Sequence, residues 1–316
     1  MASVLFPKTI DLNEASIKDL SILFNSTTTD LNKYIFTLNG VTVSKAAIMS
    51  VRMQCHQRIQ QLGNDVGNWI QNTVPQQYVQ GMQDAARQQS HFGDHVAAGL
   101  ILGAIAGGAY ANLSSKAVMT SSRILTVPNS IFDLQKQSVQ TIMDDMSRSF
   151  GNTLTYMSRS TDGIISKIQT LGIRQALAEG AKNGLSEADI SAKITKLIES
   201  NNIYGLVDKA GRQWSPEDYA NMLVRTKLVE ARNNGLMNGL LSAGKDLVEV
   251  SSHGAIDQCG PWEGRILSIS GTDQLYPSVE DAYAGGLFHP NCKHSLNSVN
   301  PSLFPSEKKS PEGAMA

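Results

Sequence analysis

The sequence predicts a mainly α-helical protein in which a helical N-terminal region is followed by a small α+β C-terminal domain. Apolar residues recur every three or four positions through most of residues 44–200, the period of an amphipathic helix. Aromatic residues make up only 6% of the chain, whereas glycines number 26, which favours helices packed through small residues. After residue 201, short apolar runs alternate with turn signals, as in a small mixed domain.

These patterns divide the chain into four parts. The first is expected to be an irregular, partly helical extension, because residues 25–29 and the pair Asn39-Gly40 are rich in turn-forming residues. A helical domain, a small α+β domain and a flexible tail follow it. The predicted boundaries are 1–43, 44–200, 201–300 and 301–316.

The longest apolar stripe begins after Ser44, a plausible N-cap, and we expect Pro75 to end that helix because proline interrupts the helical hydrogen-bond ladder. Cys55 lies on the stripe, so it is interpreted as a small buried apolar residue. Three further helices are expected in this domain. They cover residues 76–112, the segment after Pro128 with a weakened end near Gly151, and the segment opened by Ser186.

The C-terminal domain carries sharper local signals. Ser215-Pro216 places an N-cap and a first-turn proline at the start of a helix that Gly244 is expected to close. Ser278 and Asp281 have the spacing of a capping box. Strands are predicted at residues 247–250 and 265–270.

Charge gives no support to sequence-independent DNA binding. Lys and Arg number 27 against 28 Asp and Glu, and the balance holds in both halves of the chain. Three cysteines, Cys55, Cys259 and Cys292, are too few for a disulfide scaffold, which fits synthesis in a reducing cytoplasm.

Five segments of the C-terminal part, in their order and spacing, resemble the phage minor capsid protein 2 family, which is related to minor head proteins of the Mu F type. They are residues 205–219, 248–253, 259–265, 276–278 and 286–294. The resemblance implies a structural component of a tailed bacteriophage head, with the portal or major capsid protein as partner and an oligomeric arrangement in the virion. It implies a role in head assembly or DNA delivery, and no catalytic activity.

Cys259, His289, Cys292 and His294 form the most conspicuous chemical cluster, with His253 and Asp257 just upstream. Two cysteines and two histidines are a tetrahedral zinc set, and such a site would stabilise a domain with a small core. Two alternatives remain open. The histidines are packed and hydrogen-bonded around a Pro290-Asn291 turn, or Cys259 and Cys292 form a disulfide. Packed, hydrogen-bonded histidines are the favoured interpretation, so no cofactor is expected apart from the zinc alternative.

An enzyme is the third class of function considered. A metal-dependent hydrolase or nuclease would use the histidines to bind an ion and activate water, but the sequence has no acidic pair at a suitable spacing. Cys259 or Cys292 as a nucleophile would need an oxyanion site and a third group that orients the base. Neither is evident from the sequence, so no catalytic residue is assigned.

Four other residues of this domain are interpreted as structural. Trp214 and Trp262 are expected to be core anchors. Arg225 is expected to form an ion pair with a carboxylate such as Glu263, which would tie a helix to the strands.

Gly99, Gly103 and Gly107 recur every four residues within an uncharged segment, residues 95–111. That spacing lets two helices approach closely, in a membrane or in a protein interior. A buried helix against another helix or subunit is the favoured interpretation. The competing one is an ejection protein that leaves the head with the DNA and contacts the host membrane through this segment.

Overall fold

The computed structural model describes residues 14–38, 44–107, 129–179, 187–209 and 211–299. The mainly helical class with small antiparallel sheets in the C-terminal region is confirmed. By contacts the chain divides into two compact units. Residues 14–70 and 145–222 form one, called here the helix unit. The described residues among 71–144 and 223–299 form the other, called the sheet unit.

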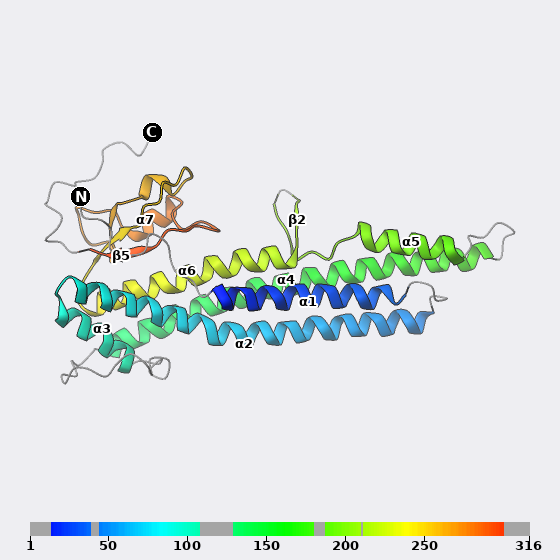
Figure 1. Ribbon diagram of the computed structural model, residues 1–316, viewed down its shortest axis with the longest axis horizontal. Helices are drawn as coiled ribbons and strands as arrows, with labels where there is room; N and C mark the ends of the chain where they lie inside the picture. The colour runs from blue at the N-terminus through cyan, green and yellow to red at the C-terminus, as the bar shows by residue number, and fades with distance from the viewer. Residues whose placement is uncertain (1–13, 39–43, 108–128, 180–186, 210, 300–316) are drawn as a thin grey trace. The chain divides into compact units, whose positions relative to one another are not determined.

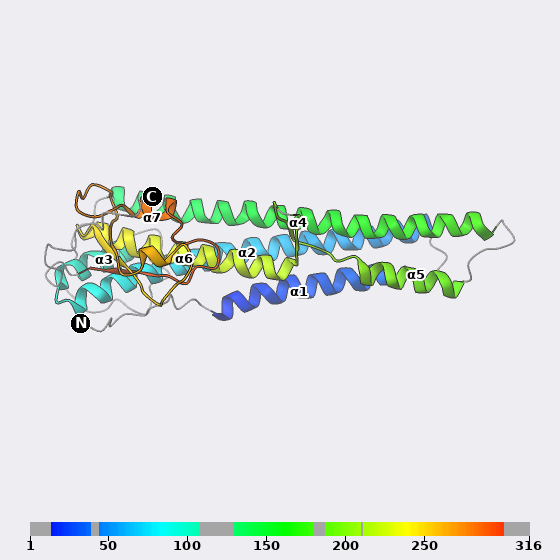
Figure 2. The same ribbon diagram turned by 90° about the horizontal axis from the view of Figure 1, so that it is seen from above.

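The helix unit contains α1 (Glu14–Phe36) and parts of α2 (Lys45–His91) and α4 (Asn129–Glu179), with α5 (Glu187–Ser200). Two-residue strands β1 (Leu206–Val207) and β2 (Gln213–Trp214) form a hairpin before α6 (Pro216–Ser242). In both views α1 runs alongside the first part of α2 (Figures 1 and 2). Helices α2, α4 and α6 contribute to both units.

Helix α1 differs from the irregular extension expected for this region. The helix continues through residues 25–29 because hydroxyl groups there bond to the helix's own backbone: Thr27 Oγ1 donates to the Leu23 carbonyl at 2.8 Å. Thr27 is also fully buried on the same face as Phe24, whose ring lies 5.6 Å from that of Phe150 on α4. Burial of this face outweighs the turn propensity of the threonines. Asn39 and Gly40 lie outside the described residues.

The prediction that Pro75 ends the helix is wrong. Helix α2 continues to His91 with Pro75 inside it. Its buried stripe runs on without interruption from Ile70 through Val74 and Tyr78 to Met82, each at most 2% exposed. The burial of these side chains on both sides of Pro75 keeps the helix continuous, although the proline has no N–H to donate. Likewise, α4 continues through Gly151.

The break between α2 and α3 (His95–Gly107) comes instead at residues 92–94. Gly93 has a φ of 81°, a left-handed conformation suited to glycine at a helix end. Asp94 then caps α3 by accepting a hydrogen bond from the Ala97 amide at 3.0 Å. Among the described residues, no helix has both the length and the apolar character needed to cross a bilayer.

The sheet unit is built around a three-stranded antiparallel sheet in the order β4-β3-β5. The C-terminal local signals are confirmed: Ser215 caps α6, Gly244 follows its end with a φ of 70°, and Ser278 makes a capping box with Asp281. The bounds in chain order are β3 (Leu247–Val250), the 3₁₀ helix η2 (Gly260–Trp262), β4 (Ile266–Ser268), α7 (Val279–Ala284) and β5 (Leu296–Ser298).

Helices α2 and α6 cross at very close range through glycines. A Cβ atom placed on Gly81 would overlap the Arg232 carbonyl oxygen, and one on Gly235 would overlap the Tyr78 carbonyl oxygen. Gly239, four residues further along α6, would bring its Cβ within 3.4 Å of the Met82 Cα. Only residues without a side chain allow two backbones to approach this closely. Gly235 and Gly239, at a spacing of four, are the sequence signal for this close approach.

Polar groups attach the sheet to these two helices. Gln88 of α2 accepts a hydrogen bond from the Ser298 amide at 2.7 Å and donates to Asn297 at 3.2 Å. Asn233 of α6 accepts from the Leu296 amide at 3.4 Å. Both amide side chains are at most 5% exposed, so these bonds hold β5 against the helices in a dry environment where unmade bonds are costly.

Gly235→Ala is expected to lower the free energy of unfolding by about 3 kcal/mol, because the added methyl group collides with the backbone of α2. Gly99→Ala is the matched control in the same unit, since its new Cβ meets nothing within 4 Å. It is expected to stabilise by roughly 0.5–1 kcal/mol through helix propensity. Denaturant unfolding of both variants measures the difference, and equal effects would contradict the close crossing.

Candidate functional site

Antiparallel pairing brings two loops together at one end of the sheet, the one between β3 and β4 and the one before β5. Because β3 runs opposite to both β4 and β5, its C-terminal end lies beside their N-terminal ends. Backbone hydrogen bonds extend this pairing past the strands. The Val250 amide donates to the Arg265 carbonyl and the Ser251 amide donates to the Ser295 carbonyl, both at 2.9 Å. The residues after β3, before β4 and before β5 are therefore brought together.

A tight turn sets the spacing of His289 and Cys292. The Cys292 amide donates to the His289 carbonyl at 2.9 Å, which closes a four-residue turn with Pro290 and Asn291 in the centre. Asn291 has a φ of 66°, a conformation that asparagine tolerates better than most residues. The turn predicted at Pro290-Asn291 is present.

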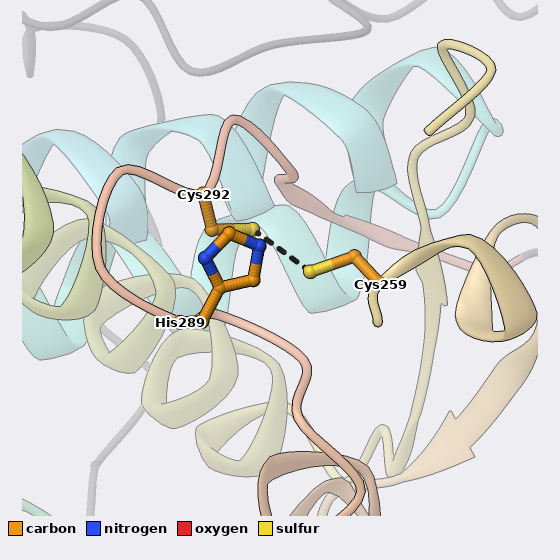
Figure 3. Close-up of side chains that lie close together, drawn as sticks. All are labelled: Cys259, His289 and Cys292. Carbon is orange, nitrogen blue, oxygen red and sulfur yellow. Dashed lines mark hydrogen bonds between the residues drawn. The ribbon is translucent and has the colours of Figure 1, made fainter. Parts of the chain in front are cut away.

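Cys259 reaches the same place from the loop between β3 and β4. It precedes the short helix η2, and its amide donates to the Asp257 carboxylate at 2.9 Å. Its Sγ lies 3.5 Å from Cys292 Sγ, and ligand atoms of Cys259, His289 and Cys292 all lie within 4.8 Å of one another. Figure 3 shows the imidazole of His289 beside the two sulfur atoms.

His294, the fourth predicted member, joins the cluster through Cys292. Its Nδ1 lies 3.2 Å from Cys292 Sγ, and its amide donates to the same sulfur at 3.4 Å. The ring is almost completely buried, and its centroid lies 4.2 Å from that of His253. The structure thus brings Cys259, His289 and Cys292 together, and His294 contacts this group at Cys292.

Glu263 orients His294 and the loop that follows β3. Its carboxylate lies 3.0 Å from His294 Nε2 and accepts hydrogen bonds from the consecutive amides of residues 253–255 at 2.9–3.1 Å. These are the contacts that the structure shows for Glu263, and the ion pair expected for Arg225 stays a prediction. The loop folds back so that its N–H groups converge on the carboxylate, an arrangement that no local sequence signal revealed.

The electrostatics of the cluster follow from these contacts. Burial alone would raise the pKa of Glu263, but the amide and His294 hydrogen bonds outweigh it and lower the pKa from 4.5 to about 2. Burial, reinforced by the Cys292 thiol, raises the pKa of Cys259 from 9.0 to about 12. Burial also lowers the pKa of His294, with the Glu263 carboxylate opposing the shift.

Two chemical interpretations fit this arrangement. Cys259, His289 and Cys292 converge as metal ligands do, and His253, Glu263 and His294 form a second close group. Cys292, His294 and Glu263 also stand in the order of a nucleophile, a base and an orienting carboxylate, so the third group that seemed to be missing is present. However, the Cys292 amide, an obvious oxyanion donor, is engaged by the His289 carbonyl.

The two tryptophans occupy different units. Trp262 is half-buried in the sheet unit, where its Nε1 donates to the Gly285 carbonyl at 3.3 Å and the Arg265 guanidinium lies 5.1 Å from its ring. Trp214 lies in the β1–β2 hairpin of the helix unit, and its Nε1 donates to Asp208 at 3.3 Å. Trp214 therefore anchors the hairpin rather than the three-stranded sheet. Arg225 lies half-buried on α6.

Of the three glycines predicted to form a helix-packing face, Gly99 is exposed and has open space around its Cα. Gly103 is half-exposed, and nothing is described of the surroundings of Gly107. Cys55 is fully buried on α2, as predicted, and burial raises the pKa of its thiol from 9.0 to about 12.

The fold and site define a class: a predominantly helical protein with a small sheet unit that carries a compact cysteine–histidine cluster. Residues 109–312 match the family model of phage minor capsid protein 2, and the chain belongs to this family. It is therefore a bacteriophage capsid component that associates with other proteins of the virion head. No curated protein and no solved structure matches the chain.

Glu263→Gln is expected to lower the free energy of unfolding by about 2 kcal/mol near neutral pH, because a neutral amide accepts the loop hydrogen bonds less strongly. Since the pKa of Glu263 is lower in the folded protein than its ordinary value of 4.5, its contribution is complete above about pH 4.5 and is lost as the pH falls toward about 2. The gap between wild type and variant should narrow over that range.

Denaturant unfolding at a series of pH values measures this gap. Glu280→Gln removes the carboxylate of an exposed glutamate on α7, outside these contacts, and is the control for the loss of one negative charge. A gap for Glu263→Gln that stays constant down to about pH 3 would contradict the proposed role of the charge.

Proposed function

We propose that the chain is a structural minor capsid protein that binds the portal or the major capsid protein and acts in head assembly or DNA delivery. The observation that carries the proposal is the family match over residues 109–312. The near-neutral charge of the chain, −1, gives no support to sequence-independent binding of DNA and fits a protein whose partners are other proteins.

The exposed face of α3 is the surface that best fits such a contact. Val96 is 67% exposed and Gly99 is exposed one turn later, whereas the opposite face of the helix is packed into the sheet unit. After His95 the helix has no charged or polar side chain, so its exposed face is both apolar and flat. A helix of a neighbouring virion protein can approach such a face closely. The packed face consists of Ala97, Ala98, Ile101, Ala104 and Ile105.

Gly99→Leu tests this contact. The substitution meets open space in the chain itself, so the purified protein is expected to keep its stability. If a partner helix packs there, the bulky side chain forces it away. A loss of about 1.4 kcal/mol in binding free energy would weaken the affinity roughly tenfold. The measurement is the copy number of the chain in purified particles. Gly151→Leu, at an exposed and open site on α4, is the matched control and should be incorporated normally.

Normal copy number and infectivity of the Gly99→Leu phage would remove this face from the proposal. Normal copy number with failed DNA delivery would instead favour the ejection protein that contacts the membrane through residues 95–111.

Cys292→Ala and His289→Ala separate a structural role from an enzymatic one. Both residues hold loops of the sheet unit, so we expect the variants to unfold that unit or to be lost from particles. Particle copy number, melting temperature and infectivity are measured together. Folded, fully incorporated and non-infectious particles would overturn the structural function and favour catalysis by the cysteine–histidine cluster.

A further inference from the structure

We propose that Cys259, His289 and Cys292, whose ligand atoms lie within 4.8 Å of one another, bind one structural Zn²⁺, and that the neighbouring His294 supplies its fourth ligand. The site joins two loops of the sheet unit, the one between β3 and β4 and the one before β5. Zinc bonds of about 2.3 Å to sulfur and about 2.0 Å to nitrogen place tetrahedral ligand atoms about 3.3–3.8 Å apart. The two sulfurs lie 3.5 Å apart, and His294 Nδ1 lies 3.2 Å from Cys292 Sγ.

His294 has its proton on the nitrogen that faces away from the sulfurs. Its Nε2 lies 3.0 Å from the Glu263 carboxylate, which only accepts hydrogen bonds, so Nε2 is the donor. In the neutral ring Nδ1 then presents a lone pair toward Cys292. A carboxylate that fixes the tautomer of a ligating histidine in this way is the usual outer shell of a protein zinc site.

Both ring nitrogens of His289 face oxygen atoms, an unfavourable contact that a bound cation would remove. Its Nδ1 lies 2.8 Å from the Pro290 carbonyl oxygen, and its Nε2 lies 3.1 Å from Asp257 Oδ2. A neutral imidazole has one N–H and can donate to only one of these two oxygens. The other nitrogen faces oxygen lone pairs unless the ring takes up a second proton or a cation. A Zn²⁺ ion beside Asp257 removes the conflict, with the Pro290 carbonyl fixing the ring.

The backbone holds the ligands ready without help from a large core. The turn at 289–292 fixes the spacing of two ligands, and the His294 amide donates to Cys292 Sγ, a contact that stabilises a thiolate. The strands of the sheet are only three or four residues long. Cys259 and Cys292 are 33 residues apart in the chain. One ion bound by both would cross-link the two loops and so stabilise this small sheet.

A disulfide and a reactive thiol account for less of the geometry. A disulfide needs the sulfurs at about 2.05 Å, well inside the separation observed, and would leave the convergence of both histidines unexplained. A nucleophilic Cys292 would have the Cys259 thiol against its sulfur. A zinc ion gives Cys259, His289 and Cys292 one common partner, with His294 beside Cys292.

The first test is metal content. Full-length protein is expressed in zinc-supplemented medium, purified under reducing conditions and measured by elemental analysis. We expect about one zinc per chain, and a clear fall in melting temperature after chelation. Cys292→Ser and His289→Ala should lose most of the metal. Cys55→Ala and His56→Ala, which lie in the helix unit outside the cluster, are the matched cysteine and histidine controls and should retain it.

The second test needs no variant, so a failure to fold cannot obscure it. Metal-free wild-type protein is titrated with Co²⁺, and tetrahedral coordination by thiolates gives strong visible bands and a sulfur-to-metal charge-transfer band. One equivalent of Zn²⁺ should abolish these bands and protect Cys292 from iodoacetamide.

Three results would overturn the proposal. They are reduced wild-type protein without zinc or cobalt bands, a Cys259–Cys292 disulfide that persists where zinc is available, and alkylation of Cys292 that zinc does not slow. None of these depends on incorporation into particles, so the metal site and the proposed capsid function can fail separately.

Discussion

The close crossing of α2 and α6 is the constraint on which the sheet unit depends. Gly81 and Gly235 let the two backbones meet where any side chain would hold them apart. The crossing is reinforced by polar contacts between the same helices: Arg232 forms an ion pair with Asp84, and Asn238 donates to the hydroxyl group of the buried Tyr78 at 2.7 Å. Buried pairs of this kind add little net stability, but they penalise every other register of the two helices.

The sheet then takes its position from this pair of helices. Gln88 and Asn233 present hydrogen-bonding groups to β5, one from each helix, and both are buried. A shift of either helix would leave these amides and the backbone of β5 without partners, at a cost of about 1–3 kcal/mol for each group. Because β3 pairs with β5, and β4 with β3, the order of the sheet transmits that position to the loops that carry the cysteines and histidines.

The cluster at the end of the sheet shows how one set of residues can serve different chemistry. Cys292, His294 and Glu263 stand in the order of a catalytic triad, yet Cys259 lies against the sulfur and the nearby amide is already engaged. A catalytic cysteine would need space and hydrogen-bond donors for a reacting group beside its sulfur. The zinc that we propose would instead join the two loops of the sheet unit.

Local signals in the sequence determined the ends of elements. Ser215, Gly244 and Ser278 act through hydrogen bonds or backbone angles within a few residues, so their roles follow from sequence alone. The strand at 247–250 and the turn at Pro290-Asn291 were predictable for the same reason. The four residues of the cysteine–histidine cluster could also be named, because their residue types and spacing are those of metal ligands.

Only the tertiary structure decided where local preference yields to burial. Helix α2 continues past Pro75, and α1 continues through Thr27, because long apolar stripes packed against other helices outweigh the cost at a single residue. The role of Glu263 is likewise absent from the sequence, since one partner, His294, comes from the loop before β5 and the others are amides 8–10 residues earlier in its own loop, which only the fold brings beside it. The sequence alone indicates the roles of residues whose partners are near in the chain, whereas the tertiary structure determines the partners of the rest.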